Sequence, residues 1–338
     1  MAASTLLAMN AGARSVPPAP NPRVQRRALH GVLLLDKPLG LTSNAALQRA
    51  RRLLRAEKAG HTGTLDPLAT GLLPICFGAA TKFSQASLDA DKGYRAVLRL
   101  GVTTTSGDGE GEVVSRRPVA VSADDLRHAC AGLVGATQQR PPMHSALKHA
   151  GRPLYAYARS GVEVERASRS ITVHALDVVE GGGDTWTVDV RCSKGTYVRT
   201  LAEAIGDALG CGAHLAALRR TAAGPLDLRE AHTFESLERL DEPARECLLL
   251  SPDALLVDWP AVQLDEADAA RFLTGLRRRL ELPDAAAVRV YGPDRAFLGS
   301  ASVRAGELVP MRLLSPAEVR AFAAPSDPAG RSPSVAMP

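Results

Sequence analysis

The sequence predicts an α+β fold built on a mainly antiparallel sheet. Strand-like and helix-like segments mix without the strict alternation typical of a parallel sheet. Residues 171–179 and 186–192 read as strands joined by the turn sequence 181–184, which is a hairpin signal. With 338 residues the chain is long enough for a large domain and a smaller second one.

The first element we expect is a buried strand in the apolar run 32–35, followed by a turn at 36–40. Ser43 then begins a helix predicted to run to about Lys58, with Gly60 ending it. Basic residues crowd this helix, and either a solvated face or a phosphate-facing surface would explain them. They are Arg49, Arg51, Arg52, Arg55 and Lys58.

Later segments supply the rest of the sheet and its helices. Ser122, with an acidic residue three positions on, indicates a capped helix to about Val134. A further apolar segment follows at 72–77, a strand is expected at 94–102, and a helix at 196–209.

The C-terminal part predicts a small β-rich domain, because short apolar runs at 288–291, 297–303 and 308–314 alternate with Gly and Pro turns. The N-terminal end is rich in Ala, Pro and Arg and shows no period, and the C-terminal end from about Ala324 reads in the same way, which predicts disorder at both. The predicted division is a tail at 1–28, a catalytic domain at 29–250, the β-rich domain at 251–318 and a mostly disordered tail at 319–338.

Composition restricts partners and compartment. The net charge of +5 suits a polyanionic partner but is a weak signal. The five cysteines form no C-x-x-C pair and lie in or beside apolar runs, which argues against structural zinc and for a reducing compartment. No stretch approaches the roughly 20 apolar residues that span a bilayer. We therefore expect a cytoplasmic protein with no membrane partner.

The segment 60–71, GHTGTLDPLATG, differs from its surroundings because three glycines and a proline punctuate it. Asp66 lies among apolar neighbours, where a carboxylate is costly to bury without a cationic partner. From the residues alone, an Asp-Pro turn is the more frequent explanation of such a segment. The segment lacks a P-loop ending, and His61 with Asp66 is too small a set for a metal site.

The longer stretch GHTGTLDPLATGLLPICFGAATKFSQ resembles the signature loop of the bacterial tRNA pseudouridine-55 synthases, the TruB family. Further blocks resemble the same family in the same order. They are GVLLLDKPLGLTSN, DKGYRAVLRLGVTT, PPMHSALKHAGRPLYAYARSGVEV and CSKGTYVRTLAEAIGDALGCGAHLAALRRTAAG. The resemblance covers about Gly31 to Gly224.

This resemblance implies a pseudouridine synthase fold, with a large mixed sheet flanked by helices and a small PUA-like RNA-binding domain at the C-terminus. The implied reaction converts uridine 55 in the T-arm of tRNA to pseudouridine: the C–N glycosidic bond breaks, the base turns over and a C–C bond forms. No cofactor or metal is implied. The implied partner is the T-arm stem-loop, bound by a monomer that needs no protein partner.

The resemblance places the catalytic carboxylate on Asp66, which acts as nucleophile at C1′ or removes a ribose proton. Arg199 matches the arginine that pairs with this carboxylate. Tyr94 matches a tyrosine that stacks on the target base and serves in proton transfer at C5. Tyr197 matches an aromatic residue of the uracil pocket, and Leu218 an apolar one.

Because the target uridine must leave its stack, His61 is implied to enter the space that the flipped base vacates. Asp108 aligns with an acidic cluster of the family, although the usual T-D-T step before it is missing. Three basic residues are candidates for RNA phosphate contacts, namely Lys82, Arg219 and Arg220.

Three other functions compete with this interpretation. One is a guide-RNA-dependent, dyskerin-like synthase that shares the Asp loop. The second is a non-catalytic tRNA-binding or chaperone protein. The third is a nucleoside or glycoside hydrolase, which would normally need a second catalytic carboxylate or a metal cluster near the loop.

Overall fold

The computed structural model describes residues 25–145 and 147–323. Within them, a nine-stranded sheet has the order β1-β3-β12-β4-β11-β10-β7, with β2 paired to β3 and β13 to β12. The strands are β1 Gly31–Lys37, β2 Ala59–His61, β3 Ala69–Phe77, β4 Lys92–Leu100, β7 Gly135–Gln139, β10 Arg169–Gly182, β11 Thr185–Cys192, β12 Ala213–Ala223 and β13 Leu226–Asp227. Of these pairs only β12 with β3 is parallel. The predicted α+β class with a mainly antiparallel sheet is confirmed.

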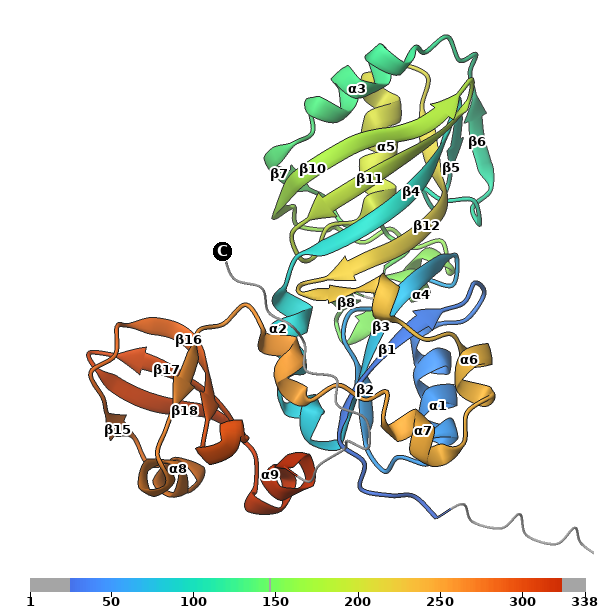
Figure 1. Ribbon diagram of the computed structural model, residues 1–338. Helices are drawn as coiled ribbons and strands as arrows, with labels where there is room; N and C mark the ends of the chain where they lie inside the picture. Colours follow the sequence, from blue (N-terminus) through green and yellow to red (C-terminus); the bar gives the residue numbers. More distant parts are fainter. Residues whose placement is uncertain (1–24, 146, 324–338) are drawn as a thin grey trace, which may run out of the picture.

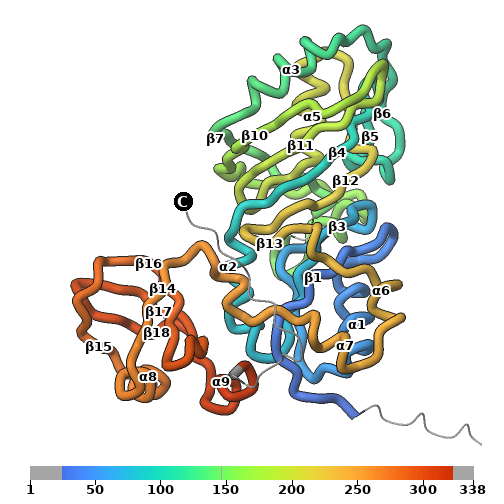
Figure 2. The backbone as a smooth tube through the Cα atoms, viewed as in Figure 1, coloured from blue at the N-terminus to red at the C-terminus, as the bar shows by residue number. Residues whose placement is uncertain are grey.

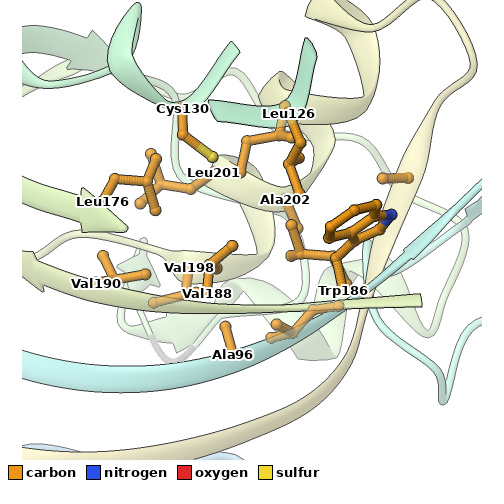
Figure 3. Close-up of a cluster of buried hydrophobic side chains, with 14 of the residues drawn as sticks. Ala96, Leu126, Cys130, Leu176, Trp186, Val188, Val190, Val198, Leu201 and Ala202 are labelled. Carbon is orange, nitrogen blue, oxygen red and sulfur yellow. The ribbon is translucent and has the colours of Figure 1, made fainter. Parts of the chain in front are cut away.

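Two helices cover one face of this sheet, α3 Ala123–Ala131 and α5 Val198–Ala208 (Figure 1). Their apolar side chains meet those of β4, β10 and β11 in one buried cluster, where Trp186 packs near Leu126 and Ala202 (Figure 3). The hairpin prediction is confirmed: β10 and β11 pair antiparallel, and alternate residues of β11 from Trp186 to Cys192 are buried. Burial of this face fixes α5, whose first turn enters the site described below.

Helix α1, Ser43–Leu53, is shorter than predicted. Its N-cap is Thr42, whose side chain accepts a hydrogen bond from Ala45 N, and it ends five residues before Lys58 because Arg55 adopts a left-handed φ of 49°. Helix α3 keeps the expected capping box at Ser122 and ends at Ala131 rather than Val134.

Helices α6, Phe234–Glu238, and α7, Glu242–Glu246, lie beside α1 although almost 200 residues separate them in sequence (Figure 2). Their carboxylates pair with basic residues in and just after α1: Arg49 with Glu238, and Arg55 with Glu242. Part of the basic helix face is therefore neutralised within the chain.

The C-terminal part forms a second sheet in the order β14-β16-β17-β18-β15 (Figure 1). Its elements are β14 Ala261–Gln263, α8 Glu266–Leu273, β15 Arg278–Arg279, β16 Ala285–Tyr291, β17 Phe297–Arg304, β18 Glu307–Leu313 and α9 Pro316–Ala323. The expected β-rich C-terminal unit is confirmed. The smaller elements of the chain are α2 Ser84–Asp89, β5 Val102–Thr104, β6 Val113–Arg116, β8 Lys148–His149, β9 Arg152–Pro153 and α4 Leu154–Ala158.

The two sheets share an apolar core. Phe83, after β3, packs on Phe297 of β17 with ring centroids 5.2 Å apart, and Phe297 also contacts Tyr291. Lys82 donates to the carbonyl of Leu313 and pairs with Glu318. The C-terminal unit is thus attached to the large sheet through buried contacts as well as through the chain.

The predicted C-terminal tail begins too early at 319, because α9 runs to Ala323 and packs Val319 and Phe322 against the core. Near the N-terminus, Arg27 of the predicted tail pairs with Glu242 and Glu246. The rest of both predicted tails, 1–24 and 324–338, lies outside the described residues. No helix in the described part of the chain is long and apolar enough to cross a membrane.

Candidate active site

The loop that carries Asp66 connects β2 to β3, and the surrounding chain holds it on several sides. The Ser43 hydroxyl bonds both the N–H and the carbonyl of Leu65, at 2.8 and 2.9 Å. Thr62 is fully buried and accepts a hydrogen bond from the Ser87 hydroxyl. Gly71 must be glycine, because its φ is +98° and a Cβ there would lie 2.3 Å from the carbonyl oxygen of Arg220. The backbone around Asp66 is therefore fixed.

Asp66 pairs with Arg199 from the first turn of α5: Nη2 lies 2.9 Å from Oδ2. The Arg199 side chain is 7% exposed, whereas that of Asp66 is 48% exposed and remains accessible. On its other side, Nη1 of Arg199 lies 3.2 Å from Oδ2 of Asp108, which is 5% exposed. The guanidinium thus connects one accessible carboxylate to one buried carboxylate.

Backbone acceptors complete the Arg199 site. Nη2 donates to the carbonyl of His144 at 2.6 Å, and Nη1 to that of Ser106 at 3.3 Å. Asp108 in turn accepts from the Ser106 hydroxyl and from the N–H of Glu110. Because a buried charge is stable only when paired and hydrogen-bonded, these contacts hold Arg199 in one orientation beside Asp66.

One pocket of about 420 Å³ opens beside this pair, within the usual size range of small-molecule sites. It brings together six of the predicted site residues, which come from the loop, β4, the start of α5 and β12. They are Asp66, Tyr94, Tyr197, Arg199, Leu218 and Arg220. Asp66 supplies the only carboxylate among the lining residues of the described chain.

Two tyrosines line the pocket, one on β4 and one at the start of α5. Tyr94 lies on β4 directly opposite Arg220 of β12. Burial raises the pKa of the Tyr94 hydroxyl, while the charge of Arg220 and a hydrogen bond from it lower that pKa. Tyr197 is the N-cap of α5, and the Gln139 side chain bonds both its N–H and its carbonyl. Both rings are thereby held at the pocket wall.

Two buried lysines near Asp66 were not predicted as site residues. Lys37 is 0% exposed and donates to the carbonyls of Pro38 and Leu41; burial lowers its pKa to about 8, against the opposing effect of Asp66. Lys92 lines the pocket and donates to three carbonyls at the end of α2; burial, reinforced by Arg220, lowers its pKa to about 8. Lys37 could have been identified as a candidate site residue from the sequence, because a lysine that directly adjoins a buried apolar strand is unusual.

His61 ends β2, opposite Ile75 of β3, and is not among the pocket-lining residues. Its Nδ1 is buried without a hydrogen-bond partner in the described chain. Burial, and then the charge of Arg220, lower its pKa. A neutral imidazole follows, and its predicted entry into the RNA stays a prediction.

The structure alters the three predicted phosphate contacts. The prediction is wrong for Arg220, because its side chain is buried at 1% residue exposure and donates to the carbonyls of Leu72 and Gly63. Arg219 faces the opposite side of β12 and binds Asp36 through both terminal nitrogens. Lys82 is held by Glu318. Contact of Arg219 or Lys82 with RNA would therefore compete with an ion pair.

The described residues contain no group of three or more His, Cys, Asp or Glu side chains arranged to hold a metal ion. The side chains that line the pocket provide a carboxylate paired with an arginine, two aromatic rings, apolar groups and several cations.

Three family models cover most of the chain. The model for the N-terminal domain of the TruB family pseudouridylate synthases matches residues 51–198. The model for the tRNA pseudouridylate synthase B C-terminal domain matches residues 199–256. The model for the C-terminal region of pseudouridine synthase II TruB matches residues 260–314.

Individual proteins agree with these models. A protein of Thiobacillus denitrificans named tRNA pseudouridine synthase B is 56% identical over 294 residues, which are 86% of this chain and 97% of that one. A protein of Ralstonia nicotianae with the same name is 56% identical over 307 residues, covering 88% and 98%. Among solved structures, a Cbf5-Nop10-Gar1 complex contains a chain that matches with a TM-score of 0.68 at 24% identity, covering 91% of this chain and 93% of that one. That likeness shows the fold.

Proposed function

This chain belongs to the TruB family of pseudouridylate synthases and isomerises uridine to pseudouridine in tRNA, and from that premise we propose that its target is uridine 55 in the T-arm loop. The pocket that joins Asp66, Arg199, Tyr94, Tyr197 and Leu218 supports the reaction, and the TruB family match supports the position. A pocket of this size accepts one nucleoside and not a stacked helix. The uridine must therefore flip out of the loop to react.

Asp66 is the group that acts on the ribose, as nucleophile at C1′ or as base for a ribose proton. Its carboxylate is accessible, while Arg199 behind it is almost fully buried and holds it by charge and hydrogen bond. As the C1′–N1 bond breaks, positive charge develops on the sugar, and a fixed carboxylate stabilises it. The base then turns over, C5 bonds to C1′, a proton leaves C5 and N1 gains one.

The other pocket residues hold the free base during that rotation. The half-buried Leu218 offers an apolar wall, and Tyr197 closes the side from which α5 enters. In this proposal Tyr94, which lines the pocket, stacks on the uracil, and its hydroxyl takes the C5 proton. His61 enters the RNA where the base was. Because no second carboxylate lines the described pocket, a hydrolase with paired carboxylates is disfavoured.

We further propose that the enzyme acts as a cytoplasmic monomer on free tRNA, without a guide RNA or a protein partner. The C-terminal unit is anchored to the large sheet by its own core and needs no second chain to hold it there. Mass photometry of the protein with and without a T-arm stem-loop tests the monomer, and a dimeric active species would contradict it.

The decisive experiment uses an isolated T-arm stem-loop labelled with tritium at C5 of each uridine. Conversion releases the label to water, and sequencing locates the pseudouridine. We expect wild-type enzyme to convert position 55 alone, with no other RNA present. Asp66→Asn should abolish conversion and leave tRNA binding nearly unchanged, while the exposed-helix control Asp124→Asn behaves like wild type.

Each alternative function has its own outcome in this experiment. Free uracil in solution would indicate a hydrolase, and conversion only with an added guide RNA would indicate the dyskerin-like branch. Binding without conversion by the wild type would leave only the chaperone function. Conversion retained in Asp66→Asn would refute the role given to that carboxylate.

A further inference from the structure

Arg220 has an unusual position for a charged residue. It lies on β12, which runs between β3 and β4 in the sheet. Its Cα pairs with that of Gly71 on β3, the strand after the catalytic loop, and with that of Tyr94 on β4. It is 1% exposed and yet lines the pocket that contains Asp66. The reaction outlined above gives this buried cation no task.

The contacts of Arg220 fix its guanidinium beside both halves of the site. Nε donates to the carbonyl of Leu72 at 2.6 Å, and Nη2 to that of Gly63 at 3.2 Å. These carbonyls lie on either side of Asp66 in the chain. Nη1 is so close to Gly63 that a Cβ there would approach it to 3.0 Å.

Arg220 also differs from Arg199 in lacking a carboxylate partner. None of the ion pairs within residues 25–145 and 147–323 includes it. Its charge instead acts on neighbouring titratable groups: it lowers the pKa of the Tyr94 hydroxyl against the larger effect of burial, and it adds to burial in lowering the pKa of Lys92. A buried cation without a counter-ion stabilises any negative charge formed next to it.

We propose that Arg220 is a positioning residue of the isomerisation, which orients the Tyr94 hydroxyl toward the uracil and stabilises the phenolate that removes the C5 proton. The inference rests on the proposed function. Arg220 acts through Tyr94, across the strand pair that holds the two side chains in register.

The proton transfer balances without any further reactant. Once C5 is bonded to C1′, the phenolate oxygen of Tyr94 takes the proton from C5. The C5–H electron pair restores the C5–C6 double bond, and N1, left anionic, gains a proton from water. The phenolate itself forms by release of its proton to water, so no electrons are exchanged with an oxidant or reductant.

A double-mutant cycle between Arg220 and Tyr94 tests the inference, because it isolates what one residue does through the other. Tritium release is measured in single turnovers with enzyme in excess, so that slow variants remain measurable. Arg220→Met should lower the rate on the order of 10²-fold in the wild-type background, the usual scale of one acid–base contribution. In the Tyr94→Phe background the same change should cost less than about threefold.

The pH dependence provides a readout that a purely structural role would not move. The rate should rise with pH as Tyr94 ionises. Arg220→Met removes a nearby cation, so it should move this rise to higher pH. Arg220→Lys keeps the positive charge but not the planar set of guanidinium donors. The rate should therefore fall at an unchanged KM, while the pH midpoint of the rate stays closer to that of the wild type.

Arg245 provides the matched control, since its guanidinium also donates to backbone carbonyls, those of Leu237 and Leu53, but lies on α7 away from the pocket. Arg245→Met should change neither rate nor pH profile. If circular dichroism shows that Arg220→Met does not fold, Arg220→Lys replaces it in the test. Its effect on the rate and on the pH midpoint is then measured with Tyr94 intact and again in the Tyr94→Phe background.

Two results would overturn the inference: an equal loss from the Arg220 substitution in both backgrounds, or a pH profile that Arg220 variants leave in place. These outcomes presuppose an active wild type. A wild type that forms no pseudouridine would instead refute the proposed function, so the two failures are distinguishable.

Discussion

Replacing Asp108 by asparagine removes one of the two carboxylates that contact Arg199 and preserves the shape of the side chain. Nη1 of Arg199 lies 3.2 Å from Oδ2 of Asp108, and both side chains are less than a tenth exposed. The asparagine oxygen can still accept from the Ser106 hydroxyl and the Glu110 N–H, the two neutral donors on Asp108. Its NH2 group then takes the place of Oδ2 and faces Nη1 of Arg199, so the substitution removes both the negative charge and the acceptor on that side of the guanidinium.

The expected magnitude follows from the burial of this pair. Breaking a buried ion pair costs about 3–5 kcal/mol, because one charge is left without compensation. Arg199 keeps Asp66 and two carbonyls, so the loss should fall near the lower limit, at about 2–3 kcal/mol of unfolding free energy. Freed on one side, the guanidinium can turn and displace Asp66, and a displacement of about 1 Å can cost on the order of 10²-fold in rate.

Two assays separate these effects. Urea unfolding gives the change in stability, and single-turnover tritium release from C5-labelled T-arm RNA gives the rate. The affinity for tRNA should stay within about twofold, since Asp108 is buried behind Arg199 and does not line the pocket. Asp124→Asn is the matched control, because its pair with Arg127 is exposed and should be worth less than about 1 kcal/mol.

The reasoning would be refuted by an Asp108→Asn enzyme that unfolds at the wild-type free energy and turns over at the wild-type rate. Arg199 would then be held by Asp66 and the backbone alone. A loss of stability with full activity would instead show that Asp108 supports the fold without orienting the catalytic pair.

Three other predictions concern charge and stacking. The folded-state pKa of Lys92, about 8, is below the ordinary lysine value of 10.5, so the unfolded chain binds more protons between these values and stability rises with pH there. From pH 7 to 9, the unfolding free energy of the wild type should rise by about 1 kcal/mol relative to that of Lys92→Met in urea titrations. Plots of unfolding free energy against pH that run parallel for the two proteins would contradict this. RNA affinity should fall steeply with salt. Lys148→Ala, which neutralises an exposed lysine next to Leu147 of the pocket lining, should reduce the slope of log Kd against log salt by about one, whereas Lys82→Met should leave it unchanged because Glu318 already pairs with Lys82. Tyr94→Ala should lower kcat/KM by at least about tenfold more than Tyr94→Phe, since only the alanine variant also loses the stacking ring; equal losses in the two variants would count against the stacking role.

Elements with strong local signals could be predicted from the sequence. The hairpin of β10 and β11 follows from alternation around a glycine-rich turn, and α3 begins at Ser122 because its capping box is encoded within four residues. Both signals act through neighbouring residues. Residues far along the sequence neither create these two elements nor change their bounds.

The end of α1 could not be predicted, because contacts far along the chain determine it. Residues 51–58 contain no helix-breaking glycine or proline. The helix stops where the carbonyl of Arg55 accepts from Arg27 N at 2.7 Å and Arg27 forms a bridge to Ala56. A segment assigned to a disordered tail thus ends the first helix.

Within the site, the type of residue was easier to predict than its burial. Two adjacent arginines at 219 and 220 look like one basic patch, but on a strand successive side chains face opposite sides. Arg219 therefore faces Asp36 and Arg220 faces the pocket. Recognition of β12 as a strand would have separated them. The link from Asp108 to Arg199 needed the fold itself, since 91 positions separate these residues in the printed sequence.

The pocket also determines when activity can appear during folding. Asp66 and Arg199 are 133 positions apart, and β12 must lie between β3 and β4 before Leu218 and Arg220 reach either. Contacts between such distant segments form only after long loops have closed, so they come late in folding. A partly folded chain has no fragment of this site. In a refolding experiment, the time at which pseudouridine formation returns therefore gives the time at which β12 joins β3 and β4 in the central sheet.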